Sequence, residues 1–273
     1  MNVKIRKLTE CSMMIALSFV LSIIKLAELP YGGSVTMAAM LPMVIVAYRH
    51  GLKWGIATAI PNAAIQLLLG LKYFSYFSTW QSLLALAFFD YIIAYAVFGL
   101  SGIFRKRVKR QNLALLLGIL LSCVLRYFCH VISGATIWAG LSIPTNAALL
   151  YSFGYNATYM IPDTLVLCVV GVYLGSVMDF RRDIPVRMSA VPLAVGEMLC
   201  YVGAGLVAVI GTVVDTVLVF PALQDPETGE FIIKGLASVN YLAVGIVTAV
   251  TVLLAVALVI VARRIKLSRD TAK

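Results

Sequence analysis

The sequence predicts an all-α protein that crosses a membrane several times. Of its 273 residues, 62% are hydrophobic and only 12% are charged, which is typical of polytopic membrane proteins. The hydrophobic residues form runs separated by short charged segments, and most runs approach the roughly 20 residues that a membrane helix requires. We expect eight membrane helices, at residues 8–26, 35–48, 52–69, 82–104, 113–139, 157–178, 191–219 and 239–261.

The basic residues indicate the orientation. Most of them lie before the first run, in the linkers at 49–53, 105–110 and 181–187, and after the last run. Cytoplasmic segments carry an excess of Lys and Arg, so these segments and both termini are predicted to be cytoplasmic in a multi-pass protein of the cell membrane. The net charge of +10 does not indicate a nucleic-acid partner, because the basic residues lie in short clusters between apolar runs.

The polar residues divide the chain into two predicted units. Residues 1–180 contain six of the expected helices and the polar residues of interest, and we interpret them as a substrate-binding membrane domain. Residues 181–273 begin with a charged linker and continue as two runs rich in Val, Ala and Leu, which we interpret as a two-helix membrane extension.

No motif for catalysis or for metal binding is present. The five cysteines lie inside apolar runs without a C-x-x-C pair, and the chain has only two histidines. The sequence lacks G-x-x-x-x-G-K-[ST], H-E-x-x-H and G-x-S-x-G, the motifs of P-loop ATPases, zinc proteases and serine hydrolases. We therefore expect no enzyme, no catalytic residue, no metal and no cofactor.

A cation in the middle of an apolar run is the clearest functional feature. Arg126 lies within the run 113–139, and His130 follows one helical turn later. A charge at this depth costs about 2.5–3.5 kcal/mol on insertion scales unless it faces protein or water. Gly134 and Trp138 continue at steps of four residues, so the four residues share one face of the helix. We expect this face to line a cavity.

A carboxylate is expected at the same depth. Counting from the outer helix ends places Asp90, in the run 82–104, level with His130 and one turn from Arg126. A buried Asp90–Arg126 ion pair of structural importance is an alternative that can coexist with binding. His130 can likewise be a structural hydrogen-bond donor. Asp163, beside Pro162, is a further carboxylate inside a run, either as a polar contact or as a partner for backbone freed by the proline.

Aromatic and amide side chains gather near the same level. Tyr151 and Asn156 precede the run 157–178, and Tyr91 follows Asp90. Aromatic rings are common at membrane interfaces, but here they can also stack on a flat or cationic ligand. The outer half of the membrane is thus predicted to bind a small, polar, partly aromatic molecule from outside.

Four fragments resemble a known family. KLTECSMMIALSFVLSI, DY at 90–91, RYFCHVISGATIW and YSFGYNATYMIP are similar to the thiamine-specific S component of energy-coupling factor (ECF) transporters. The resemblance covers roughly residues 8–174. It implies a six-helix domain that binds thiamine near the outer surface and docks onto an ECF scaffold subunit with two ATPase subunits, which supply the energy.

The resemblance also implies residue roles. The implied substrate-binding residues are Asp90, Tyr91, Arg126, His130, Gly134, Trp138, Tyr151 and Asn156. The implied docking motif is Ser12-x-x-x-Ala16, a pair of small residues that by itself indicates either internal packing or a partner-facing helix.

The sequence departs from the family pattern at three places. Asp90 stands for a glutamate, Arg126 stands for a lysine, and a tryptophan of the first outer loop is replaced near Gly33. Another small vitamin or a thiamine-precursor pyrimidine therefore remains an alternative ligand. A stand-alone transporter coupled to protons through Asp90, Asp163 or His130 is a second hypothesis, and a structural assembly protein is a third.

Overall fold

The computed structural model describes residues 3–29, 32–138, 145–188, 194–223 and 233–271. The chain divides into two compact units, Met1–Arg187 and Met188–Lys273, which are treated separately below. The predicted helix ends at residues 139 and 191, and part of the first outer loop at residues 30–31, lie outside the described ranges.

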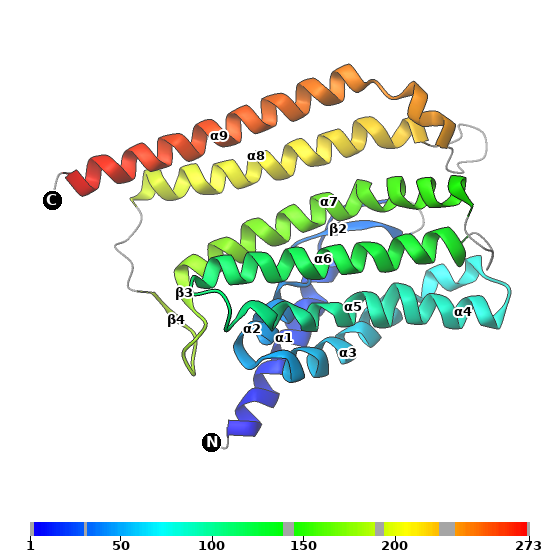
Figure 1. Ribbon diagram of the computed structural model, residues 1–273, viewed down its shortest axis with the longest axis horizontal. Helices are drawn as coiled ribbons and strands as arrows, with labels where there is room; N and C mark the ends of the chain where they lie inside the picture. Colours follow the sequence, from blue (N-terminus) through cyan, green and yellow to red (C-terminus); the bar gives the residue numbers. More distant parts are fainter. Residues whose placement is uncertain (1–2, 30–31, 139–144, 189–193, 224–232, 272–273) are drawn as a thin grey trace. The chain divides into compact units, whose positions relative to one another are not determined.

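The first unit is a bundle of helices (Figure 1). Its helices are α1 (Val3–Ile23), α2 (Leu41–His50), α3 (Leu52–Leu69), α4 (Trp80–Leu86), α5 (Ala94–Ala96), α6 (Gln111–Thr136) and α7 (Asn146–Val177). A π-helical segment (Ala87–Ile93) joins α4 to α5, and a 3₁₀ segment (Val97–Phe104) continues α5, so that Trp80–Phe104 is one continuous helix. The centre is α2, whose side chains are almost all buried.

Five helices in the described part of the chain are long and apolar enough to cross a membrane. They are Trp80–Phe104, Gln111–Thr136, Ala148–Val177, Val195–Leu223 and Tyr241–Arg269. The prediction of a helical multi-pass membrane protein is thereby confirmed. The other three expected spans correspond to α1, α2 and α3; α2 has only 10 residues, about 15 Å of helix, and Pro61 lies inside α3.

The predicted helix at residues 35–48 is wrong at its start. Ser34–Thr36 (β2) pairs antiparallel with Lys25–Glu28 (β1), and α2 begins only at Leu41. Positive φ at Ala38 (55°) interrupts the chain before the helix, and Pro at the first turn of α2 favours the helix start there. The β1–β2 hairpin consequently contributes to the core, where Val35 is 1% exposed.

The start of the sixth expected helix is also wrong. The prediction began it at residue 157, whereas α7 begins at Asn146. The hydroxyl of Thr145 accepts a hydrogen bond from the backbone of Ala148 (3.1 Å), which caps the helix. Tyr151 and Asn156 therefore lie on α7 rather than before it, and Asp163 lies near the middle of the helix.

A charged contact links the hairpin to the segment after α3. The Glu28 carboxylate accepts hydrogen bonds from Lys25 (2.7 Å), Lys72 (3.0 Å) and Tyr73 (3.2 Å). The hydrogen bonds from Lys25 and then Lys72 lower the pKa of Glu28 to about 2. The side chains involved are solvent-exposed, so this link contributes little to stability.

At the opposite end of the bundle, Arg49 joins three segments. Its guanidinium forms a two-point ion pair with Glu10 of α1, and it is only 5% exposed. It also donates to the carbonyl oxygens of Phe180 (2.9 Å), Arg182 (3.1 Å) and Asp183 (3.1 Å). These three residues lie in the turn of a short hairpin of β3 (Met178–Asp179) and β4 (Val186–Arg187), so Arg49 fixes that turn to α1 and α2.

The second unit is a pair of packed helices, α8 (Val195–Val219) and α9 (Tyr241–Thr271). Gly211 permits their close approach, because a Cβ there would lie 2.0 Å from the hydroxyl of Thr251. The hydroxyl of Thr248 donates to Asp215 across the same contact (2.7 Å). Few residues of either helix are buried within the unit, as expected for helices whose apolar side chains face lipid.

Candidate functional site

A π-helical turn positions the central carboxylate. Asp90 lies inside the segment Ala87–Ile93, where the helix Trp80–Phe104 widens, and is 8% exposed. Single π-helical turns within α-helices frequently occur at functional sites. Asp90 occupies such a turn, and its role in binding stays a prediction.

Two donors from α6 and its C-terminal end hold the Asp90 carboxylate. Oδ1 lies 3.0 Å from Nδ1 of His130, and Oδ2 accepts a hydrogen bond from Nε1 of Trp138 (3.0 Å). The expectation that Asp90 and His130 lie at the same level is thus met. Both carboxylate oxygens are occupied, as a buried carboxylate requires.

The expected alternative of an Asp90–Arg126 ion pair is wrong. Nη1 of Arg126 lies 3.2 Å from Oδ2 of Asp163 on α7 instead. Nη2 donates to the hydroxyl of Tyr95 (3.3 Å), and the guanidinium stacks on the Tyr95 ring, 4.8 Å from its centroid. This pairing satisfies the intramembrane cation, and both partners are buried.

His130 connects the two carboxylates. Nε of Arg126 donates to Nε2 of His130 (3.4 Å), so Nε2 is the acceptor nitrogen. Nδ1 then carries the proton and donates it to Asp90, which describes a neutral imidazole. A continuous hydrogen-bonded chain therefore runs from Asp163 through Arg126 and His130 to Asp90.

The β1–β2 hairpin reaches the same chain. The backbone N–H and the hydroxyl of Thr36 both donate to Oδ1 of Asp163, each at 2.9 Å. The backbone N–H of Gly33 donates to the hydroxyl of Tyr155 (3.1 Å), and a Cβ at Gly33 would lie 2.6 Å from the Tyr159 ring. This loop, where the family pattern has a tryptophan, thus packs its bare backbone against α7.

Gly134 and Asn156 take part in packing between α6 and α7. A Cβ at Gly134 would lie 2.3 Å from the hydroxyl of Ser152, which donates to the Val131 carbonyl (2.8 Å). Asn156 donates to the Ser152 carbonyl (2.8 Å) and accepts from the Tyr159 hydroxyl (2.7 Å). Both residues therefore lie where α6 and α7 pack closely, next to Ser152.

Each of the two predicted tyrosines stacks on another tyrosine of its own helix. Tyr91 donates to the Gly70 carbonyl at the end of α3 (3.4 Å), and its ring stacks on Tyr95, 6.4 Å between centroids. The Tyr151 ring stacks on Tyr155 of the same helix, 6.2 Å between centroids. A role of the two rings in binding the ligand stays a prediction.

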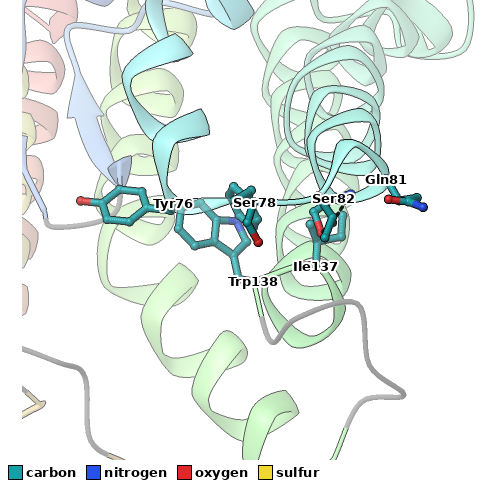
Figure 2. Close-up of a pocket in the computed structure, with 8 residues that line it drawn as sticks. Tyr76, Ser78, Gln81, Ser82, Ile137 and Trp138 are labelled. Carbon is teal, nitrogen blue, oxygen red and sulfur yellow. Dashed lines mark hydrogen bonds between the residues drawn. The ribbon is translucent and has the colours of Figure 1, made fainter.

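An open groove of about 550 Å³ adjoins Asp90 through Trp138 (Figure 2). Its lining combines aromatic rings with hydroxyl and amide groups, from Tyr76, Phe77, Ser78, Thr79, Gln81, Ser82, Ile137 and Trp138. Figure 2 shows the Trp138 indole beside the Tyr76 ring, whose centroid is 6.0 Å away, and Phe77 packs edge-on at 4.9 Å. The same indole that binds Asp90 therefore lines the groove.

The sequence reasoning left three contributors out of the candidate site. Asp163 was expected as a polar contact, as a partner for backbone freed by Pro162 or as a proton-coupling group, but not as the partner of Arg126, and Thr36 and Tyr95 were not predicted to take part. Asp163 could have been predicted as the partner of Arg126, because a cation inside the membrane needs an anionic partner. No pattern in the sequence distinguishes Thr36 or Tyr95 from their neighbours.

The close contact at Gly134 allows a test of the α6–α7 packing. Gly134→Ala is expected to lower the melting temperature, because the Ser152 hydroxyl must leave its position or the helices must separate; overpacking typically costs about 1–3 kcal/mol. Thermal unfolding of the purified protein in detergent measures the change.

Gly154→Ala on α7 is the matched control, since a Cβ there meets nothing within 4 Å. Alanine favours the helix over glycine by up to about 1 kcal/mol, so this control should melt at the same temperature or higher. Equal melting temperatures for the two variants would contradict the packing role of Gly134.

Fold and site together define a class of protein. A multi-pass helical bundle with buried charges linked to an open groove is typical of a membrane protein that handles a small polar molecule. The family model for the thiamine transporter protein (Thia_YuaJ) matches residues 8–181, and the chain belongs to this family. The match ends before α8, so the second unit lies beyond it.

A sequence relative agrees with this assignment, and a solved structure has a similar fold. The thiamine transporter ThiT of Bacillus subtilis (strain 168) is 30% identical over 175 residues, which span 60% of this chain and 87% of that protein. A solved structure of ThiT from Listeria monocytogenes has a similar fold, with a TM-score of 0.52 and 23% identity over 64% of this chain and 95% of that one.

Proposed function

We propose that this chain binds thiamine as the substrate-binding S component of an ECF-type importer. The observation that carries the proposal is the buried Asp90 carboxylate, held by His130 and Trp138 beside an outer groove in a member of the thiamine transporter family. An aminopyrimidine amine can donate to Asp90 in place of the Trp138 indole. Released from that bond, the indole can stack on the ligand, where a cation over an aromatic face gains about 0.5–2 kcal/mol.

The direction of uptake follows from the proposed orientation. With both termini and the basic linkers in the cytoplasm, the C-terminal end of α6 and the groove face the outside. Substrate would then be captured from the outer side. Labelling of single cysteines introduced into loop 105–110 and into the groove segment 76–79 tests this, because only the groove cysteines should react in intact cells.

In the proposed importer the energy of ATP hydrolysis comes from partner subunits, since this sequence contains no P-loop. We propose that α1 docks onto an ECF scaffold subunit that carries two ATPase subunits, with Ser12 and Ala16 at the contact. Both residues are exposed on α1. They lie on the same face of the helix as the exposed Leu8 and Val20, at steps of four residues. Small residues on such a face allow close approach of another helix.

A fluorescence titration tests the ligand. We expect thiamine to quench the tryptophan fluorescence of the purified protein in a saturable way. The quenching should come mainly from Trp138, because the other tryptophans, Trp54 and Trp80, are not among the residues that line the groove. Trp138→Phe should lose most of the quenching, and calorimetry should still detect its weaker binding. Absence of binding to thiamine, its phosphates and its pyrimidine fragment would reject this ligand class.

The hydrogen-bonded chain from Asp163 to Asp90 also keeps a second function open, a proton-coupled transporter that works alone. Uptake in cells that lack ECF scaffold and ATPase subunits separates the two. Accumulation that depends on the proton gradient in those cells would favour the second function. Binding without accumulation, restored by co-expressed scaffold and ATPases, would support the first.

A further inference from the structure

The buried charges of the candidate site do not sum to zero. Among the described residues of the first unit, the charged side chains classed as buried are Arg49, Asp90, Arg126 and Asp163. Arg49 lies at the other end of the bundle with Glu10. Asp90, Arg126 and Asp163 remain, two anions and one cation.

The contacts show which anion is left uncompensated. Arg126 and Asp163 form an ion pair at 3.2 Å, so their charges cancel locally. Asp90 is held by the indole of Trp138 and by His130, whose Nε2 accepts a hydrogen bond and which is therefore neutral. Neutral donors satisfy the lone pairs of Asp90 without removing its charge.

We propose that Asp163 determines the specificity of this site for a singly charged cation, an inference that rests on the proposed thiamine-binding function. By neutralising Arg126, Asp163 leaves one negative charge at Asp90 for the ligand to balance. Without Asp163, the positive charge of Arg126 would neutralise the negative charge of Asp90. The two groups are close because both contact His130. Asp163 acts through Arg126 and does not itself need to touch the ligand.

Asp163 has a structural contact that must be separated from this role. Its Oδ1 accepts from the backbone and hydroxyl of Thr36, and its Oδ2 faces Arg126. The two oxygens thus have different partners. Asp163→Asn removes the charge, whereas Thr36→Val removes one hydrogen bond from the hairpin and leaves the charge.

The experiment compares thiamine with 3-deazathiamine, an uncharged analogue of the same shape, by calorimetry on the detergent-purified full chain. The measured quantity is the ratio of the two Kd values, because a purely structural defect should weaken both compounds alike. We expect Asp163→Asn to lower the preference for thiamine about tenfold. Arg126→Gln combined with Asp163→Asn should restore the preference, since the net charge of the site is again negative. Thr36→Val should leave it unchanged.

If Asp163→Asn alone does not fold, Arg126→Gln and the double variant Arg126→Gln/Asp163→Asn still test the inference. Arg126→Gln retains both carboxylates and the double variant retains one, so the preference for thiamine should be lower in the double variant than in Arg126→Gln. An equal ratio in wild type and Asp163→Asn, or in these two variants, would overturn the inference. A fall in Thr36→Val equal to that in Asp163→Asn would also overturn it. Wild-type protein that binds neither compound would instead reject the proposed function.

Discussion

Replacing Asp90 with asparagine is expected to weaken thiamine binding about 10- to 150-fold. The asparagine keeps the size of the side chain but loses the charge, and hydrogen bonds to charged groups contribute about 1.5–3 kcal/mol. The structure also predicts a modest fall in melting temperature, because the amide keeps only one of the two oxygens that contact His130 and Trp138. Arg126 is paired with Asp163, so the substitution does not leave a buried cation without a partner. Calorimetry and thermal unfolding on the same sample measure both quantities.

Asp90→Glu is the matched control, because it keeps the carboxylate and adds one methylene. Its affinity should lie between those of the wild type and Asp90→Asn. If Asp90→Asn binds thiamine as tightly as the wild type, Asp90 does not contact the ligand amine. In that case Asn156, whose amide now binds Ser152, is the next candidate.

Replacing Arg49 with glutamine is expected to destabilise the first unit by about 3–5 kcal/mol, the typical cost of removing one partner of a buried ion pair. The substitution deprives Glu10 of its two-point partner and leaves three carbonyl oxygens of the β3–β4 turn without their common donor. Glu10 keeps a contact to His50 (3.0 Å), which limits the loss. Denaturation in detergent, followed by circular dichroism, measures the change.

Arg182→Gln on the same turn provides the control. Arg182 pairs with Asp179 at 3.1 Å, but its side chain is 68% exposed, and exposed pairs contribute about 0–1 kcal/mol. Each variant removes one positive charge, and the two residues are neighbours in space because Arg49 donates to the Arg182 carbonyl. A similar loss of stability in both would show that charge balance matters there and that the buried contacts of Arg49 do not.

Part of the site could be predicted because depth in a membrane can be counted along a helix. Asp90 and His130 lie on helices whose expected outer ends were close to those observed, and the two side chains meet at 3.0 Å. The partner of Arg126 could not be predicted in the same way. The start of α7 is set by Thr145 rather than by hydrophobicity, and the pairing of Asp163 with Arg126 depends on how α6 and α7 pack, which no sequence pattern specifies.

The β1–β2 hairpin was missed for a different reason. Hydrophobic runs alone do not distinguish a buried strand from the start of a helix. Val35 and Thr36 read as the beginning of a membrane span, but positive φ at Ala38 separates them from α2. The contact of Thr36 with Asp163 joins residues 127 positions apart, and such a pairing is decided by tertiary packing.

The π-helical turn at Ala87–Ile93 gives the helix Trp80–Phe104 two independent phases. A π turn holds about one residue more than an α turn, so the halves before and after it are rotated by about 100° relative to an uninterrupted helix. The half after the turn can therefore keep Phe98 and Gly99 packed on the bundle while the half before it takes another rotation beside the groove. Loss of a single residue from this turn would rotate the whole preceding half at once, a route by which the groove can change without altering the packing of Phe98 and Gly99.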